Sequence, residues 1–141
     1  MSTSNDRILV VDDNDFIRAS MVKFLESNHH DVVGVSNAQD AMHELRENPC
    51  GLIITDVLMP DTDGFELVEY IRGYDEPLRS TPIIAISGGG KTIDAGTVLT
   101  ALEEKVDLIL KKPFSKKELL DNTASLLRKS SGEQNRGYSV T

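Results

Sequence analysis

Leu52-Ile53-Ile54-Thr55-Asp56 is the stretch of sequence that decides the fold. An apolar run of strand length ends there in a carboxylate, and Pro60 and a polar turn follow closely. Nearly continuous apolar strands are typical of parallel sheets that are buried on both faces. In open parallel sheets the ligand crevice lies outside the carboxyl ends of the strands. Asp56 is therefore expected where chemistry can take place.

A second strand ends in the same way, because Arg7 to Val11 runs directly into Asp12 and Asp13. If the two strands are parallel neighbours, three carboxylates converge on one pocket. Like charges at close range raise one another's pKa unless a hard cation neutralises them through oxygen ligands. The pattern predicts a divalent-cation site made by Asp12, Asp13 and Asp56, with Mg²⁺ as the favoured ion and Mn²⁺ as the alternative.

Strand and helix patterns alternate along the rest of the chain. Further strands are expected at Asp31–Val35, Pro82–Ile86 and Leu108–Leu110. Helices are expected from the Asp13 turn to Asn28 and at about Thr92–Glu104. Three more are each expected to begin at a capping box: Ser36 with Gln39 for a helix that ends at Asn48, Asp63 with Glu66 for one that ends at Gly73, and Ser115 with Glu118 for the last helix. Five β–α units predict an α/β fold, a doubly wound parallel sheet with five helices over its two faces.

Composition limits the class of protein. The 141 residues suit one domain over residues 7–129, with a flexible segment at 1–6 and a polar, disordered tail at 130–141. No run approaches the roughly 20 apolar residues of a membrane span, and the polar start lacks a signal-peptide pattern. The single cysteine, Cys50, fits the cytoplasm. A net charge of −8 argues against nucleic-acid binding.

Chemically complementary groups end the last two strands. Ser87 ends one with a hydroxyl, and Lys111-Lys112-Pro113 ends the other. With a divalent ion on the acids, one Asp56 oxygen would stay free as a nucleophile, while Lys112 and Ser87 could hold the other oxygens of an arriving phosphoryl group. This arrangement suits phosphoryl transfer.

Over Arg7 to about Lys129 the chain resembles the receiver domain of bacterial two-component response regulators. Four motifs carry the resemblance: Val10-Val11-Asp12-Asp13, Asp56 with Met59-Pro60 and Asp63-Gly64, Ile86-Ser87, and Lys112-Pro113-Phe114. Each motif is weak alone, and together they are specific. The resemblance implies a flavodoxin-like sheet with strand order 2-1-3-4-5.

The resemblance also implies roles for individual residues. Asp56 would accept phosphate from a sensor histidine kinase or a histidine phosphotransfer protein, with Mg²⁺ on Asp13, Asp56 and the Leu58 carbonyl and with Asp12 bound through water. Ser87 would move to meet the phosphate, and Lys112-Pro113 would be a cis peptide. We expect a stand-alone phosphoacceptor rather than a turnover enzyme, which signals to an output protein as a monomer or a phosphorylation-dependent dimer.

The sequence departs from the family pattern in two respects. Ile109 stands three residues before Lys112, where the family usually has an aromatic residue that rotates with the hydroxyl residue. Gly88-Gly89-Gly90 make the following loop unusually permissive. We therefore expect phosphorylation to order the segment from Ser87 to about Glu104 without an aromatic rotation.

Other interpretations compete with this one. Ala85 to Thr92 resembles the phosphate-binding loop of a nucleotide-hydrolysing enzyme, with alanine in place of the first glycine, but no later strand ends in the acid that such a site needs. A dehalogenase-like phosphatase would need an acid at Leu58. A calcium loop at Asp61–Gly64 fails because Met59 and Tyr70 occupy ligand positions. His29, His30 and His43 form no metal pattern and are expected on the surface.

Overall fold

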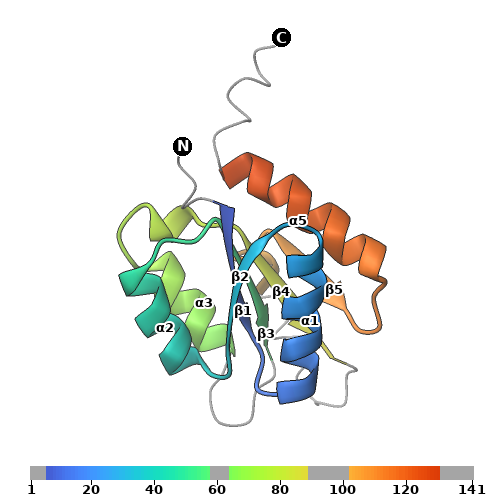
Figure 1. Cartoon of the computed structure of the whole chain (residues 1–141). Coiled ribbons are helices and arrows are strands. Elements are labelled where there is room, and N and C mark those ends of the chain that lie inside the picture. Colours follow the sequence, from blue (N-terminus) through green and yellow to red (C-terminus); the bar gives the residue numbers. More distant parts are fainter. Residues whose placement is uncertain (1–5, 58–63, 89–101, 131–141) are drawn as a thin grey trace.

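A computed structural model describes residues 6–57, 64–88 and 102–130. Its centre is a five-stranded parallel sheet, drawn in Figure 1. The strands are β1 (Arg7–Val11), β2 (Asp31–Val35), β3 (Leu52–Asp56), β4 (Ile83–Ser87) and β5 (Leu108–Lys111). Their order is β2-β1-β3-β4-β5, which confirms the predicted doubly wound sheet.

Helices cover both faces of the sheet (Figure 1). The helices α1 (Asp15–Ser27) and α5 (Lys116–Ser130) lie over one face, and α2 (Ala38–Glu47) and α3 (Gly64–Arg72) lie over the other. Successive strand residues point to opposite faces, so Ile8 and Val10 pack under α1 and α5 whereas Leu9 and Val11 pack under α2 and α3. The sheet is thus buried on both sides, as its apolar strands predict.

The helix expected at about Thr92–Glu104 falls mostly on residues 89–101, which lie outside the described part. Leu102 and Glu103 are helical, and Leu102 is fully buried in the core on the α2 and α3 side. The predictions of a flexible segment at 1–6 and of a disordered tail at 130–141 also fall largely on undescribed residues. The short 3₁₀ turn at Leu78–Ser80 is an element that the sequence patterns did not predict.

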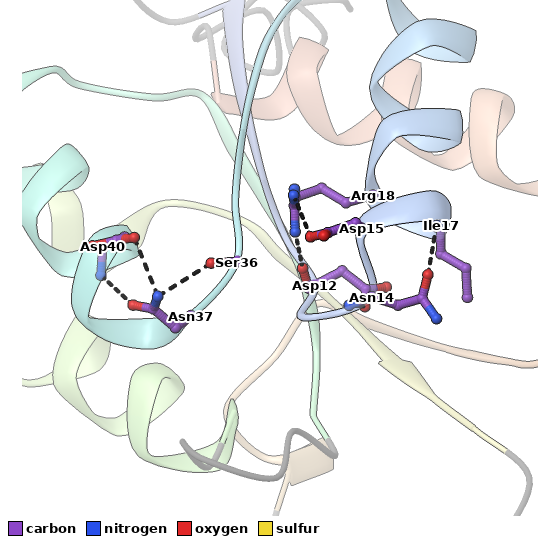
Figure 2. Close-up of polar contacts among 8 residues, drawn as sticks. All are labelled: Asp12, Asn14, Asp15, Ile17, Arg18, Ser36, Asn37 and Asp40. Carbon is purple, nitrogen blue, oxygen red and sulfur yellow. Dashed lines mark hydrogen bonds and ion pairs between the residues drawn. The ribbon is translucent and has the colours of Figure 1, made fainter.

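The helix starts show which capping predictions are correct. At α5 the capping box is confirmed, because the Glu118 N–H donates to Ser115 Oγ at 2.9 Å and the Ser115 N–H donates to Glu118 Oε1 at 3.0 Å. At α2 the prediction of Ser36 is wrong. The cap is Asn37, whose Oδ1 accepts the Asp40 N–H at 2.7 Å and whose amide donates to the Asp40 carboxylate (Figure 2). Asp63, the predicted cap of α3, lies outside the described residues.

The register of the sheet brings the chemistry to one edge. Val11 pairs with Thr55, Asp56 with Ile86, and Ser87 with Lys111. The residues at the carboxyl ends of four strands therefore lie side by side. None of the described helices is both long and apolar enough to cross a membrane.

Candidate functional site

Three carboxylates meet at the carboxyl ends of β1 and β3. Asp12, Asp13 and Asp56 each offer an oxygen, and these oxygens lie within 4.8 Å of one another. Asp12 and Asp56 are buried, whereas Asp13 is exposed. The site predicted from the two strand ends is therefore assembled.

Two hydrogen bonds fix the position of Asp12. Its backbone N–H donates to the Val35 carbonyl at 3.1 Å, and its Oδ1 accepts the Asn14 N–H at 2.9 Å. Burial is the main influence on this carboxyl and raises its pKa, with the Asn14 N–H and then the Lys112 charge acting in the opposite direction. Its Oδ2 is buried and has no hydrogen-bond partner among the described residues. That oxygen is available to a ligand.

The turn after Asp12 is stabilised by residues outside the predicted site. Asn14 caps α1 by accepting the Ile17 N–H at 2.9 Å. Arg18, one turn into α1, reaches back to donate to the Asp12 carbonyl and to the Asp15 carboxylate, as Figure 2 shows. The signal in the sequence is the spacing of Asp15 and Arg18, which places opposite charges on one face of a helix.

Lys112 and Ser87 lie beside the acids. The Lys112 ammonium is 3.9 Å from Asp56 Oδ2, and the backbone N–H of Lys112 donates to the Ser87 carbonyl at 2.9 Å. Ser87 is the last residue of β4 and is 8% exposed. The Lys112–Pro113 peptide is cis, as the resemblance implies. A cation and a hydroxyl-bearing residue thus accompany the three carboxylates.

Gly64 makes a close approach to the site possible. A Cβ atom built at this position would lie 2.3 Å from the Asp56 carbonyl oxygen and 2.6 Å from the Val57 Cα. No side chain fits at such distances, so the first turn of α3 can pack against the end of β3 only because residue 64 is glycine. This gives a physical reason for the glycine of the Asp63-Gly64 motif.

The donor set fits a small, hard divalent cation. Carboxylate oxygens are the ligands that Mg²⁺ prefers, and the partnerless Oδ2 of Asp12 is a buried acceptor without a donor among the described residues. Leu58, whose carbonyl is the remaining ligand implied by the resemblance, lies outside the described residues. The acidic triad could therefore hold a metal ion.

Other predicted positions contribute less to the site. Ile109 is half-buried and packs against the core with Val106, and the ordering expected from Ser87 to Glu104 falls mainly on undescribed residues. Only Ala85 to Gly88 of the alternative phosphate-binding loop are described, and Ala85 to Ser87 belong to β4. His29 and His43 are exposed, as expected, and His30 is half-buried, where burial lowers its pKa.

A hollow of about 360 Å³ lies at the opposite edge of the sheet, where β3 and β4 begin. It is lined by Leu45, Tyr74 and Pro82 among others, and by none of the three acids. Cys50 also lines it, and burial raises the pKa of its thiol to about 12. A thiol of that pKa stays protonated at neutral pH, so Cys50 is not a reactive nucleophile.

The comparisons with known proteins agree with this geometry. The family model described as "Response regulator receiver domain" matches residues 8–124. The transcriptional regulatory protein GltR of Pseudomonas aeruginosa is 36% identical over 140 residues, which are 99% of this chain and 56% of that protein.

Among solved structures, the signal receiver domain of a signal transduction histidine kinase from Syntrophus aciditrophicus is 29% identical, with a TM-score of 0.77 over 88% of this chain and 91% of that one. A CheY-like response regulator receiver domain protein from Methanospirillum hungatei is 25% identical, with a TM-score of 0.76 over 91% of this chain and 98% of that one. The chain spans about half the length of the curated relatives that it matches.

Proposed function

This chain belongs to the response regulator receiver family of two-component systems, and we propose that Asp56 is the phosphoacceptor of this chain. Members of the family are phosphoacceptors rather than turnover enzymes. Receiver domains generally take their phosphoryl group from histidine kinases. The donor of this chain is then the phosphohistidine of such a kinase or of a phosphotransfer protein. The observation that carries the proposal is the convergence of three carboxylates within 4.8 Å beside Lys112.

In the proposed reaction an Asp56 carboxylate oxygen attacks the phosphorus atom. A P–O bond to Asp56 forms while the P–N bond to the donor histidine breaks, and the imidazole leaves with the electron pair of that bond. Lys112 stabilises negative charge on the phosphoryl oxygens, because its ammonium already lies beside Asp56. Ser87, at the end of the neighbouring strand β4, donates a hydrogen bond from its hydroxyl to another of these oxygens.

A Mg²⁺ ion is the proposed cofactor, with Mn²⁺ as a substitute. Asp13, Asp56 and the Leu58 carbonyl would hold it directly, and Asp12 would hold it through water. When bound, the ion neutralises the carboxylates and the incoming phosphoryl oxygens. The buried Oδ2 of Asp12, which has no partner among the described residues, supports this assignment.

We propose that the output is a phosphorylation-dependent contact with another protein, made by a stand-alone regulator. This proposal is supported by the CheY-like receiver domain protein of Methanospirillum hungatei, because this chain covers 98% of the chain in that structure. The mass of the protein isolated from its native cells tests the stand-alone role. A mass matching the 15.5 kDa chain supports it, and a substantially larger polypeptide would refute it.

The central test uses acetyl phosphate as a small donor. With Mg²⁺ present, intact-mass measurement should find one phosphoryl group on the wild type and none on Asp56→Asn. In this assay the acetyl P–O bond breaks and acetate leaves. An unmodified wild type, or an equally modified Asp56→Asn variant, would refute the proposal. ATP binding that is lost in Lys91→Ala would instead favour the phosphate-binding loop.

A further inference from the structure

Arg18 joins helix α1 to the turn that carries the acids. Its Nη1 donates to the Asp12 carbonyl oxygen at 2.9 Å, and its Nη2 donates to Asp15 Oδ1 at 2.7 Å (Figure 2). The side chain of Arg18 is 22% exposed and that of Asp15 is 87% exposed, so the contact with the Asp12 carbonyl is the shielded arm of this fork. A planar guanidinium can hold two such acceptors in fixed directions, which a lysine ammonium cannot do.

The hydrogen bond to Asp12 fixes a particular peptide group. The Asp12 carbonyl belongs to the planar unit that continues into the N–H and Cα of Asp13. The preceding peptide group is held as well, because the Asp12 N–H donates to Val35. The backbone is therefore restrained on both sides of Asp12. This restraint fixes the position of the Asp13 backbone, from which the Asp13 side chain extends.

Asp13 depends on this restraint more than its neighbours do. Its side chain is exposed, and it makes no hydrogen bond or ion pair among the described residues. Asp12, by comparison, has the Asn14 N–H on its carboxylate. The placement of the Asp13 carboxylate within the triad therefore relies on the backbone that Arg18 holds.

Gly34 in β2 makes room for the stem of Arg18. A Cβ atom at Gly34 would lie 3.2 Å from Arg18 Cγ, 3.3 Å from Arg18 Cδ and 3.0 Å from Val22 Cγ2. These distances are shorter than ordinary carbon–carbon contacts, so a methyl group there would displace the Arg18 stem by a few tenths of an ångström. Gly34→Ala is thus a way to disturb Arg18 without changing any charge.

We propose that Arg18 is a positioning residue, which holds the Asp12–Asp13 peptide and thereby sets the affinity of the triad for its divalent cation. The inference rests on the proposed function, because it takes the triad to be a cation site. Removing an outer partner that orients metal ligands costs about 10- to 100-fold in affinity. A loss of this size is expected when the Arg18 fork is removed.

The sign of the effect separates positioning from simple electrostatics. Arg18 is a cation near the acids, so on charge alone its removal would tighten the binding of a divalent cation. Positioning predicts the reverse. Arg18→Met removes the charge and both donors, whereas Arg18→Lys keeps the charge and loses the fork. Positioning predicts weaker binding in both variants; charge alone predicts tighter binding in Arg18→Met and no change in Arg18→Lys.

The experiment is a Mn²⁺ titration followed by the paramagnetic resonance signal of free Mn²⁺, with Mg²⁺ as competitor. We expect the Kd for Mn²⁺ to rise about tenfold or more in Arg18→Met and Arg18→Lys, and by a smaller factor in Gly34→Ala. Lys23→Met is the matched control, since Lys23 is an exposed cation on the same helix. Its Kd should stay within about twofold of the wild type.

A second readout excludes a merely structural role. The Mg²⁺ concentration that gives half-maximal phosphorylation by acetyl phosphate should rise with the Kd, while the rate at saturating Mg²⁺ should stay within about threefold of the wild type. Circular dichroism at the assay temperature verifies that each variant is folded.

An unchanged or tighter Kd in Arg18→Met would overturn the inference and leave the proposed function standing. A wild type that binds no Mn²⁺ or Mg²⁺ would overturn both.

Discussion

The Lys112 ammonium lies 3.9 Å from the Asp56 carboxylate, so the chain places a cation beside its proposed nucleophile before any phosphoryl group arrives. Lys112→Gln should slow phosphorylation by acetyl phosphate on the order of 100-fold at saturating Mg²⁺, because a donor aimed at the developing charge is lost. Lys111→Gln is the matched control, since Lys111 is exposed on the adjacent position of β5. Time courses of intact mass measure both, and equal rates in the two variants would contradict the role of Lys112.

His29 is a separate feature that concerns stability alone. It has φ = 72° and closes α1, with its N–H donating to the Glu26 carbonyl while the His30 N–H donates to the Leu25 carbonyl. This pairing is a Schellman motif, in which glycine is favoured at the left-handed position. His29→Gly should therefore stabilise the fold by about 1 kcal/mol and raise Tm by roughly 3 °C.

Thermal unfolding of His29→Gly and of His30→Gly tests this idea. His30 has no positive φ, so glycine there should bring no such gain. A lower Tm in His29→Gly than in the wild type would show that contacts of the imidazole outweigh the backbone strain.

The sheet and most of the site could be predicted because both are properties of strand ends. In the sequence, each apolar run is followed by a polar residue that marks the end of a strand: Asp12, Asp56, Ser87 and Lys112. Parallel pairing of the strands then brings those ends together. The structure agrees at each of these positions. The cis Lys112–Pro113 peptide came from family resemblance rather than from the pattern of the sequence.

The contacts that depend on side-chain reach could not be predicted in this way. Arg18 spans α1 and β2 because Gly34 leaves room for its stem, and nothing in the spacing of these two residues indicates that contact. Choosing between Ser36 and Asn37 as the cap of α2 likewise needs the backbone, since both residue types are good caps. The need for glycine at position 64 follows only from its distance to the Asp56 carbonyl.

Gly64→Ala should destabilise the fold by more than about 2 kcal/mol, because the added methyl group would overlap the Asp56 carbonyl oxygen and the Val57 backbone. Gly73→Ala is the control, since a Cβ there would lie 3.3 Å from its nearest neighbour, the Glu69 carbonyl oxygen. Urea unfolding gives both free energies. Equal losses in the two variants would show that the end of β3 tolerates the added methyl group.

Asp12 is expected to cost stability and to serve the metal site at once. Burial raises the pKa of its carboxyl, so the folded chain holds the proton more tightly than the unfolded chain does. The metal-free protein should therefore lose stability as the pH rises from the ordinary carboxyl pKa through the raised one. The total loss is about 1.4 kcal/mol for each unit by which the pKa in the folded state exceeds that in the unfolded state. Asp12→Asn keeps an acceptor for the Asn14 N–H and removes the buried charge.

In EDTA at pH 7, Asp12→Asn should consequently melt at a higher temperature than the wild type, and the gain should shrink as the pH is lowered through the raised pKa of the wild-type carboxyl. In Mg²⁺ the difference in Tm between the two proteins should narrow or change sign, because a ligand that binds only the native state stabilises it more the more tightly it binds. Asp13→Asn provides the contrast: its carboxylate is exposed, so its loss should leave Tm in EDTA nearly unchanged and still remove the response to Mg²⁺. A wild type more stable than Asp12→Asn in EDTA at pH 7 would mean that Asn14 and Lys112 outweigh the cost of burying the charge.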